Sequence, residues 1–377
     1  MSVWPIMPLG QLIEEVSERN RDMSCTDVYS VTNSQGFVPS EDYFNKKVFS
    51  KDITNYKLVR RGMFAYNPSR INVGSISWLQ TKDCVAVSPL YVIFRVNGEK
   101  LLQRWVEYFL RSDIGLTQIR SLTSGSVRDT LKYSALERIE IPVAPIEKQR
   151  EMVETMEAVD EAIEVCQAIL DKTEELVKSR FIEMFGDLAL SSNMQEVCKI
   201  ITDGTHQPPK FVSTGIPFIF VSNIVNDYLT YKAEKFISED TYNELVKRTP
   251  IEIGDLLLST VGSYGHPAIV ESERKFLFQR HIAYLKPDHS KINSQYLHAV
   301  ILSDAVQRQI ESKVKGIAQK TLNLSEIKSL RIPLPKMELQ NQFADFVKLA
   351  DKSKLVIREL LEKHQLMKEA LMQEYFG

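Results

Sequence analysis

The chain has 377 residues, of which 44% are hydrophobic, so it can bury the cores of two or three ordinary domains. Its four cysteines are widely separated and form no CxxC pair, which argues against a disulfide framework and favours a reducing, cytoplasmic setting. No apolar run approaches the roughly 20 residues of a membrane span, and the N-terminus lacks the basic start of a signal peptide. The formal net charge of −2 does not by itself indicate a nucleic-acid partner, so the distribution of charge has to be examined.

A repeat at an offset of 191 residues organises the sequence. The stretch IPVAPIEKQ at 141–149 returns as IPLPKMELQ at 332–340, and the correspondence continues without a gap on both sides. Upstream, Leu131 matches Leu322; downstream, Asp160 matches Asp351. An internal repeat is the strongest indication of architecture in a sequence, so two copies of one structural unit are expected.

Residues 1–146 alternate short runs of β-branched and aromatic residues with turns rich in Gly, Asn, Asp and Ser, which predicts an α+β globule. Its last loop, SLTSGSVRDTLKYS, combines glycine with hydroxyl, guanidinium and ammonium groups, which suits close approach to a sugar-phosphate backbone. An ordinary solvated surface loop is an equally open interpretation. The candidate DNA-contacting residues of this globule are Arg70, Ser126, Arg128 and Lys132.

Residues 147–186 are predicted to form a long helix, because prolines stop before this segment and glycine is absent until its last residue. Apolar and small residues follow alternating steps of four and three over about four heptads, which is typical of a coiled coil. A helix packed on its own domain core is the alternative, but a second helix of matched length favours pairing between the two. The stripe runs through Met152, Met156, Val159, Ile163, Cys166, Leu170, Thr173, Val177, Arg180 and Met184, with Met156, Ile163, Leu170 and Val177 as the main pairing positions.

Residues 187–337 are predicted to form a second α+β globule, more diverged from the first than the motif that leads into the helices. Polar and basic loops again supply the candidate DNA contacts. They are Thr205, His206 and Lys210 in DGTHQPPK, Ser263 and His266 in TVGSYGH, and Lys315, Gln319 and Lys320 in ESKVKGIAQKTLNLS.

Residues 338–377 are predicted to form the second long helix, with a stripe at Phe343, Phe346, Ala350, Ser353, Ile357, Leu360, His364, Met367 and Leu371. Of these, Phe343, Ile357 and Leu371 are the main pairing positions. Residues 147–187 carry a net charge of −7 and residues 338–377 carry −1, which leaves +6 on the globules and their loops. A phosphate-binding surface is therefore expected on the globules rather than on the helices.

No complete catalytic motif accompanies these features. The chain contains no GxxxxGK[ST] loop and no GxGxxG after a strand, and NPSR at 67–70 is only half of an amino-methyltransferase motif. A metal-dependent nuclease built from Asp255, Glu273 and Lys275 is a remote alternative. Asp255 fits better as a polar residue at the start of a strand, and ESERK at 271–275 as a hairpin tip. The histidines and cysteines show no metal-ligand pairing, so neither a catalytic residue nor a metal site is expected.

The order globule, helix, globule, helix and the pattern G…TL…S…I.IP…P…E.Q resemble the specificity (S) subunit of type I DNA restriction–modification systems. ITDGTHQPPKFVSTGIPFIFVSNI is similar to the DG.H..P opening of many target recognition domains in that family, and GDLLLSTVGSYG matches another recurrent stretch. The first globule departs from the DG.H form and resembles a different branch of these domains, and both helix-entry motifs depart slightly from the usual EQ.

The resemblance implies two α+β target recognition domains separated by two long antiparallel coiled-coil helices, related by an internal pseudo-twofold repeat. It further implies a double-stranded DNA target of two unlike half-sites, two docked methyltransferase subunits, and restriction/translocase subunits. S-adenosylmethionine, ATP and Mg²⁺ would then belong to the partner subunits, and this chain would carry no cofactor. A restriction enzyme in its own right and a coiled-coil adaptor with protein-binding globules are the other interpretations, and the missing motifs argue against the first.

Overall fold

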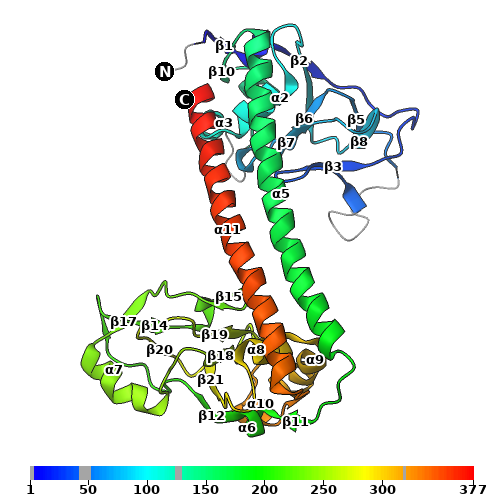
Figure 1. Ribbon diagram of the computed structural model, residues 1–377. Helices are drawn as coiled ribbons and strands as arrows, with labels where there is room; N and C mark the ends of the chain where they lie inside the picture. Colours follow the sequence, from blue (N-terminus) through cyan, green and yellow to red (C-terminus); the bar gives the residue numbers. More distant parts are fainter. Residues whose placement is uncertain (1–3, 42–51, 124–129, 317–319) are drawn as a thin grey trace. The chain divides into compact units, whose positions relative to one another are not determined.

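The computed structural model describes residues 4–41, 52–123, 130–316 and 320–377 (Figure 1). Its contacts divide the chain into two compact units: unit 1 is Met1–Gln167 with Glu359–Gly377, and unit 2 is Ala168–Arg358. Each unit therefore contains one globule together with a segment of each long helix. No helix among the described residues is long and apolar enough to cross a membrane.

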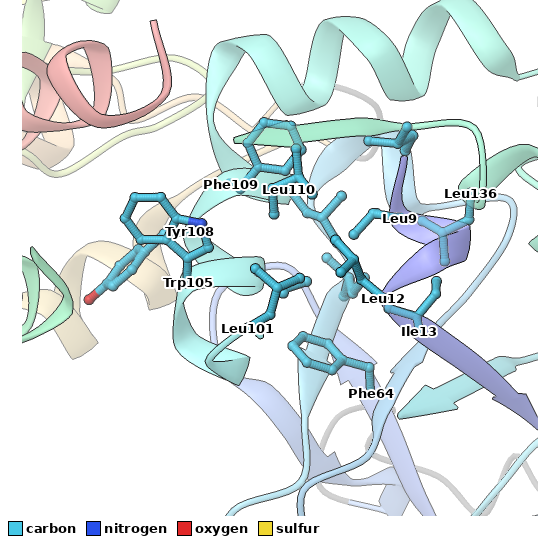
Figure 2. Packing of buried hydrophobic residues seen from close by; sticks show 14 of the residues in the cluster. Leu9, Leu12, Ile13, Phe64, Leu101, Trp105, Tyr108, Phe109, Leu110 and Leu136 are labelled. Atoms are coloured by element: carbon cyan, nitrogen blue, oxygen red, sulfur yellow. The ribbon is translucent and has the colours of Figure 1, made fainter. Parts of the chain in front are cut away.

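Unit 1 is built on a four-stranded antiparallel sheet in the order β2–β9–β6–β7. Side chains alternate between its faces, so Phe64 and Phe94 pack into one core while Ala65 and Ile93 pack into another. The first core also takes in α2 and the last residues of the chain, and Figure 2 shows Trp105 and Phe109 of α2 among its members. The strands are β1 (Ile6–Pro8), β2 (Ile13–Val16), β3 (Tyr29–Thr32), β4 (Gly36–Pro39), β5 (Lys57–Arg60), β6 (Phe64–Tyr66), β7 (Ile76–Trp78), β8 (Cys84–Val87), β9 (Val92–Val96) and β10 (Glu140–Pro142); the helices are α2 (Gln103–Arg111), α3 (Asp113–Leu122) and α4 (Tyr133–Leu136), with short 3₁₀ turns at Leu9–Gln11 and Ile71–Val73.

Unit 2 repeats this sheet in the order β12–β21–β18–β19 and adds a second sheet, β13–β17–β14–β20, in which β14 and β20 are parallel. Alternation again separates two cores, because Leu256 and Leu258 face the helices whereas Leu257 faces the second sheet. The strands are β11 (Ser192–Asn193), β12 (Cys198–Asp203), β13 (Phe211–Val212), β14 (Ile216–Ile219), β15 (Ile224–Val225), β16 (Tyr228–Leu229), β17 (Lys235–Ile237), β18 (Leu256–Ser259), β19 (Pro267–Ile269), β20 (Leu277–Phe278), β21 (Ile282–Pro287) and β22 (Arg331–Ile332); the helices are α6 (Met194–Val197), α7 (Glu239–Leu245), α8 (Ser294–Leu302), α9 (Asp304–Lys313) and α10 (Leu324–Lys328), with 3₁₀ turns at Val221–Asn223 and Val246–Arg248.

The offset of 191 residues holds for structure as well as for sequence. It relates both bounds of α2 to those of α8 and both bounds of α3 to those of α9. It also relates side-chain hydrogen bonds. Gln149 accepts from the Leu102 amide and donates to the carbonyls of Lys100 and Ala144, and Gln340 makes the matching bonds with Asn293, Lys291 and Pro335. Both glutamines are fully buried, so they fix the start of each long helix against its globule.

The long helices α5 (Ile146–Phe185) and α11 (Met337–Phe376) are continuous and have the same length, again at an offset of 191 residues. Within unit 1 their segments run in opposite directions, because Asp160 pairs with Lys368 at 2.6 Å while Cys166 lies 4.0 Å from His364. Within unit 2, the Phe181 and Phe185 rings of α5 lie against Phe343 near the start of α11.

The expected stripe of α5 agrees with its burial: Met156 and Leu170 are buried, and Ile163 and Val177 are half-buried. In α11, Phe343 is buried, and Ile357 and Leu371 are half-buried. For every second position of the α11 stripe, the prediction was wrong by one residue. Ser353, Leu360 and Met367 are exposed, and Phe346 is less buried than its neighbour; the covered positions are Val347, Lys354, Leu361 and Lys368. The expected stripe followed apolar residues, whereas two covered positions are lysines whose ammonium groups pair with Asp351 and Asp160.

Candidate nucleic-acid interface

The central sheet of unit 2 gathers several loops at one edge. Strands β12 and β18 both pair antiparallel with β21, so β12 and β18 end where β21 begins. Because β19 pairs antiparallel with β18, it begins at that same edge. We call this the loop edge of unit 2 and define it as residues 204–206, 260–266, 279–281, 315 and 320–322.

Main-chain hydrogen bonds join these loops into one surface. The Arg280 amide donates to the Thr205 carbonyl at 3.1 Å, and the Thr260 amide donates to the His281 carbonyl at 3.0 Å. The Leu322 amide donates to the Thr260 carbonyl at 2.9 Å, and Lys315 and Thr321 exchange two bonds. Segments far apart in the sequence are therefore held at fixed relative positions, which is how a binding surface built from loops is kept rigid.

A charged cluster lies at the end of β12. Nε2 of His206 lies 2.9 Å from a carboxylate oxygen of Asp203, and the guanidinium group of Arg248 pairs with the other oxygen of the same carboxylate. Arg280 and His281 follow on the adjoining loop, where burial and the nearby guanidinium of Arg280 lower the pKa of His281. The cluster presents two arginines and two histidines beside one carboxylate, a composition that suits contact with phosphate or with base edges.

The structure brings most of the sequence-predicted residues of the second globule to the loop edge. Thr205 is half-buried there, and His206, Ser263, Lys315 and Lys320 are exposed. Lys210 is exposed just before β13, on the connection to the second sheet. His266 precedes β19 at the edge, but its Nδ1 lies 2.9 Å from the Asp227 carboxylate. Gln319 lies outside the described residues.

Lys315 does not present an unpaired charge. Its ammonium group lies 3.1 Å from the Glu326 carboxylate, which also lies 3.5 Å from Lys313. These two lysines lower the pKa of Glu326. Glu326 belongs to the first turn of α10, so the basic character expected of this loop is partly neutralised by the helix that follows it.

The corresponding edge of unit 1 is built in the same way. The Leu131 amide donates to the Pro68 carbonyl at 3.0 Å, which corresponds to the bond from Leu322 to Thr260 in unit 2. This bond joins the loop after β6, which carries Arg70, to the loop that carries Lys132, and both side chains are exposed. The structure therefore brings Arg70 and Lys132 to one edge, whereas Ser126 and Arg128 lie outside the described residues.

Two of the three residues considered for a nuclease, Asp255 and Lys275, are engaged in other contacts. Asp255 is buried and accepts hydrogen bonds from the Tyr284 hydroxyl at 2.6 Å and the Glu252 amide at 2.8 Å. Burial raises the pKa of Asp255. Lys275 pairs with Glu239, and the described residues contain no group of three or more potential metal ligands. The segment 271–275 was expected to be a hairpin tip, but it connects β19 to β20, which belong to different sheets.

Two arginines and one histidine at or beside the loop edge were not predicted from the sequence: Arg248, Arg280 and His281. Arg280 and His281 directly precede β21, so their position at a strand start was a usable signal. Arg248 had no such signal, because it reaches the edge only through its tertiary contact with Asp203, 45 residues away.

The described residues thus form a duplicated α+β scaffold with polar loops at one edge of each central sheet. Comparison with known families assigns it: residues 30–175 and 191–363 match the model described as "Type I restriction modification DNA specificity domain". The chain belongs to this family.

Individual relatives agree with that assignment. The EcoBI specificity subunit of Escherichia coli is 29% identical over 139 residues, which cover 37% of this chain and 29% of that protein. The putative MjaX specificity subunit of Methanocaldococcus jannaschii is 25% identical over 189 residues, which cover 48% of this chain and 44% of that protein. The aligned stretches thus span less than half of either relative. A crystal structure of the type I S subunit from M. genitalium has the same fold, with a TM-score of 0.61, 13% identity, and coverage of 99% of this chain and 96% of that chain.

Proposed function

We propose that this chain is the DNA-recognition subunit of a type I restriction–modification complex, and that each globule contacts one half of a bipartite, asymmetric target. The observation that carries the proposal is the pair of equivalent scaffolds with different loop edges. Equivalent scaffolds present two surfaces in the same way, and different loops on them contact different bases. The family assignment supports the same function.

The loop edges supply the chemistry that DNA binding requires. Unit 2 combines Arg248, Arg280 and Lys320 with the hydroxyl of Thr205 and the imidazole of His206, and unit 1 contributes Arg70 and Lys132. Cationic side chains bind phosphates and set the register on the duplex, while side chains with mixed donors and acceptors distinguish base edges in the major groove. We assign Lys320 to phosphate contact and His206 to contact with a base.

The long helices would serve as the spacer and as the docking surface. Along their length they keep apolar side chains in solvent, among them Ile182, Leu349 and Val356, which are 60–66% exposed. Exposed apolar residues are typical of protein–protein interfaces where they gather in one patch, and these positions are available to a partner subunit. We propose that α5 and α11 form an antiparallel coiled coil with a pseudo-twofold relation, and that two methyltransferase subunits dock on it.

Catalysis is assigned to partner subunits in this proposal. The methyltransferase subunits would bind S-adenosylmethionine, and restriction/translocase subunits would use ATP and Mg²⁺. This chain would provide no cofactor site and no catalytic residue of its own.

The salt dependence of DNA binding tests the proposal. Lys320→Ala should lower affinity for all duplexes alike and reduce the slope of log K against log salt by about one unit, because one phosphate contact is lost. Lys199→Ala is the matched control, since Lys199 is an exposed lysine near the start of β12, the end of that strand away from the loop edge. Equal slopes for wild type, Lys320→Ala and Lys199→Ala would show that the loop edge does not contact DNA.

A further inference from the structure

A small hairpin in unit 2 lies outside both of its four-stranded sheets. Strands β15 and β16 pair through Ile224 with Leu229 and Val225 with Tyr228. The two turn residues, Asn226 and Asp227, both have positive φ, +50° and +64°. Such a turn matches the twist of a two-residue hairpin and tolerates Asn and Asp better than other non-glycine residues. The hairpin is therefore specified locally.

One side of the hairpin is fixed to the scaffold of unit 2. The Asp227 carboxylate lies 2.9 Å from Nδ1 of His266, just before β19, and the Asp227 carbonyl accepts from Nε2 of His298, on α8, at 3.0 Å. Burial lowers the pKa of His298 and so favours the neutral ring, in which Nε2 carries the proton that it donates to this carbonyl. The tip of the hairpin thus contacts both the loop edge and a helix packed on the central sheet.

The other side of the hairpin is fixed to α11. The Tyr228 hydroxyl accepts from the Lys354 ammonium at 2.7 Å and lies 3.3 Å from the Asp351 carboxylate. Lys354 also pairs with Asp351 at 2.7 Å and is only 6% exposed. The guanidinium of Arg358 lies 5.6 Å from the centre of the Tyr228 ring, within the range of a cation–π contact. Because a lysine is rarely buried unless its charge is paired, this junction is specific rather than incidental.

In unit 1 the long helix is fixed to its globule by a different tyrosine. Asp160 occupies the position of Asp351 in the repeat, and it accepts from the Tyr108 hydroxyl of α2 at 2.8 Å. The position of Tyr108 is Ala299 in unit 2, which has no hydroxyl. The tyrosine that reaches the helix aspartate is supplied in unit 2 by the hairpin instead. In unit 1 the long helix is therefore held by a tyrosine of α2, a helix that has a counterpart in unit 2. In unit 2 it is held by a tyrosine of the β15–β16 hairpin.

We propose that the β15–β16 hairpin positions the loop edge of unit 2 relative to α11, with Tyr228 and Lys354 as positioning residues. The inference rests on the proposed function, in which the long helices set the distance between the half-sites. A loop edge fixed to its helix accepts one spacing of the half-sites, and a loop edge with a loosened hairpin accepts neighbouring spacings as well. The bases contacted do not change, because neither Tyr228 nor Lys354 belongs to the loop edge.

The test uses the full chain assembled with its methyltransferase subunits. Methylation is measured on a DNA library that carries both half-sites at the native spacing and at spacings one base pair shorter and longer. Tyr228→Phe should reduce the preference for the native spacing by roughly tenfold, since a hydrogen bond to a charged group contributes about that much. The half-site sequences should stay unchanged. Lys354→Met should act in the same direction.

Tyr231→Phe is the matched control, because the Tyr231 hydroxyl is buried and has no hydrogen-bond partner among the described residues. A uniform loss of methylation at every spacing, or an unchanged preference in both Tyr228→Phe and Lys354→Met, would overturn the positioning role. If the wild-type complex methylates no bipartite target at any spacing, the proposed function fails instead, so the two failures are distinguishable.

Discussion

The two units place large side chains at the same four positions, but the types of side chain differ between them. In unit 2 these positions hold Phe181, Phe185, Tyr296 and Phe343, with the Phe185 and Tyr296 rings 4.8 Å apart and the Phe185 and Phe343 rings 5.6 Å apart. In unit 1 the equivalent positions, 191 residues away, hold Met372, Phe376, Trp105 and Met152, with the Trp105 and Phe376 rings 4.5 Å apart. Each unit thus packs the end of one long helix against a globule and the start of the other helix.

The comparison shows which parts of a duplicated scaffold are free to change. Unit 2 fills the four positions with aromatic rings, and unit 1 fills them with two aromatic residues and two flexible methionines. Either set can satisfy close packing. The glutamine at each helix start keeps the same hydrogen bonds, whereas the polar contacts between globule and helix differ, with Tyr108 in unit 1 and Tyr228 in unit 2. Packing and the helix start are common to both units, and the elements next to the loops are specific to each.

The largest expected effect comes from using one copy of the repeat alone. In a fragment of residues 1–186, Phe181 and Phe185 can occupy the places that Met372 and Phe376 fill in unit 1, so two fragments can pair antiparallel. Because the acidic helix carries −7, this pairing should need moderate salt or the partner subunit. A dimer of identical globules should direct methylation to an interrupted palindrome. Mapping of modified adenines checks this, and a fragment that stays monomeric with its partner present would show that the units are not interchangeable.

The next largest effect is expected from truncating a core side chain, which should lower the stability of the two units by different amounts. Phe343→Ala should destabilise unit 2 by about 3–5 kcal/mol, because it removes a buried ring from an aromatic cluster. Met152→Ala, at the equivalent position, should cost unit 1 only about 1–2 kcal/mol, since Met152 is half-buried. Urea unfolding measures both: all three tryptophans lie in unit 1, so their fluorescence follows that unit, while circular dichroism follows the whole chain. Equal losses would mean that the four positions do not differ in packing.

The fold could be predicted from the sequence where the pattern of apolar residues matches the positions that are buried. The prolines before each long helix and the heptad spacing placed both helices within one residue of their observed starts. Two of the four alternate covered positions of α11 were missed because Lys354 and Lys368 occupy them, and a charged residue is covered only when tertiary contacts satisfy it. Arg70 and Lys132 were expected from the sequence, and the structure brings their loops, 62 residues apart, to one edge of unit 1. The position of Arg248 could not be predicted, because only the folded chain brings it to Asp203.

Substitution of the helix-start glutamines should affect the units equally. Gln149→Leu and Gln340→Leu each leave two carbonyls and one amide without their partner, which should cost about 3 kcal/mol in the unit concerned. Gln149→Leu should shift the tryptophan-detected transition, and Gln340→Leu should leave it unchanged while shifting the transition seen by circular dichroism. A loss at only one of the two positions would contradict their equivalence.

The smallest effect is a pH dependence confined to unit 2. Burial lowers the pKa of His298 below its usual 6.5, so the unfolded chain binds a proton at a pH where the folded chain does not. The stabilisation from neutral His298 is therefore present above about pH 6.5 and is lost as the pH falls toward the lowered pKa, by about 1.4 kcal/mol per pH unit. His298→Gln should flatten this slope in urea unfolding followed by circular dichroism. An unchanged slope would show that the pKa of His298 does not differ between the folded and unfolded states.

The central claim, one globule for each half-site, is tested most directly by mapping methylated adenines across a genome. The full complex with wild-type chain and with His206→Ala should be compared in the same cells. The account predicts one bipartite, asymmetric target for the wild type, and for His206→Ala an altered base preference in one half only. A contiguous target, or a base preference altered in both halves by this single substitution, would contradict it.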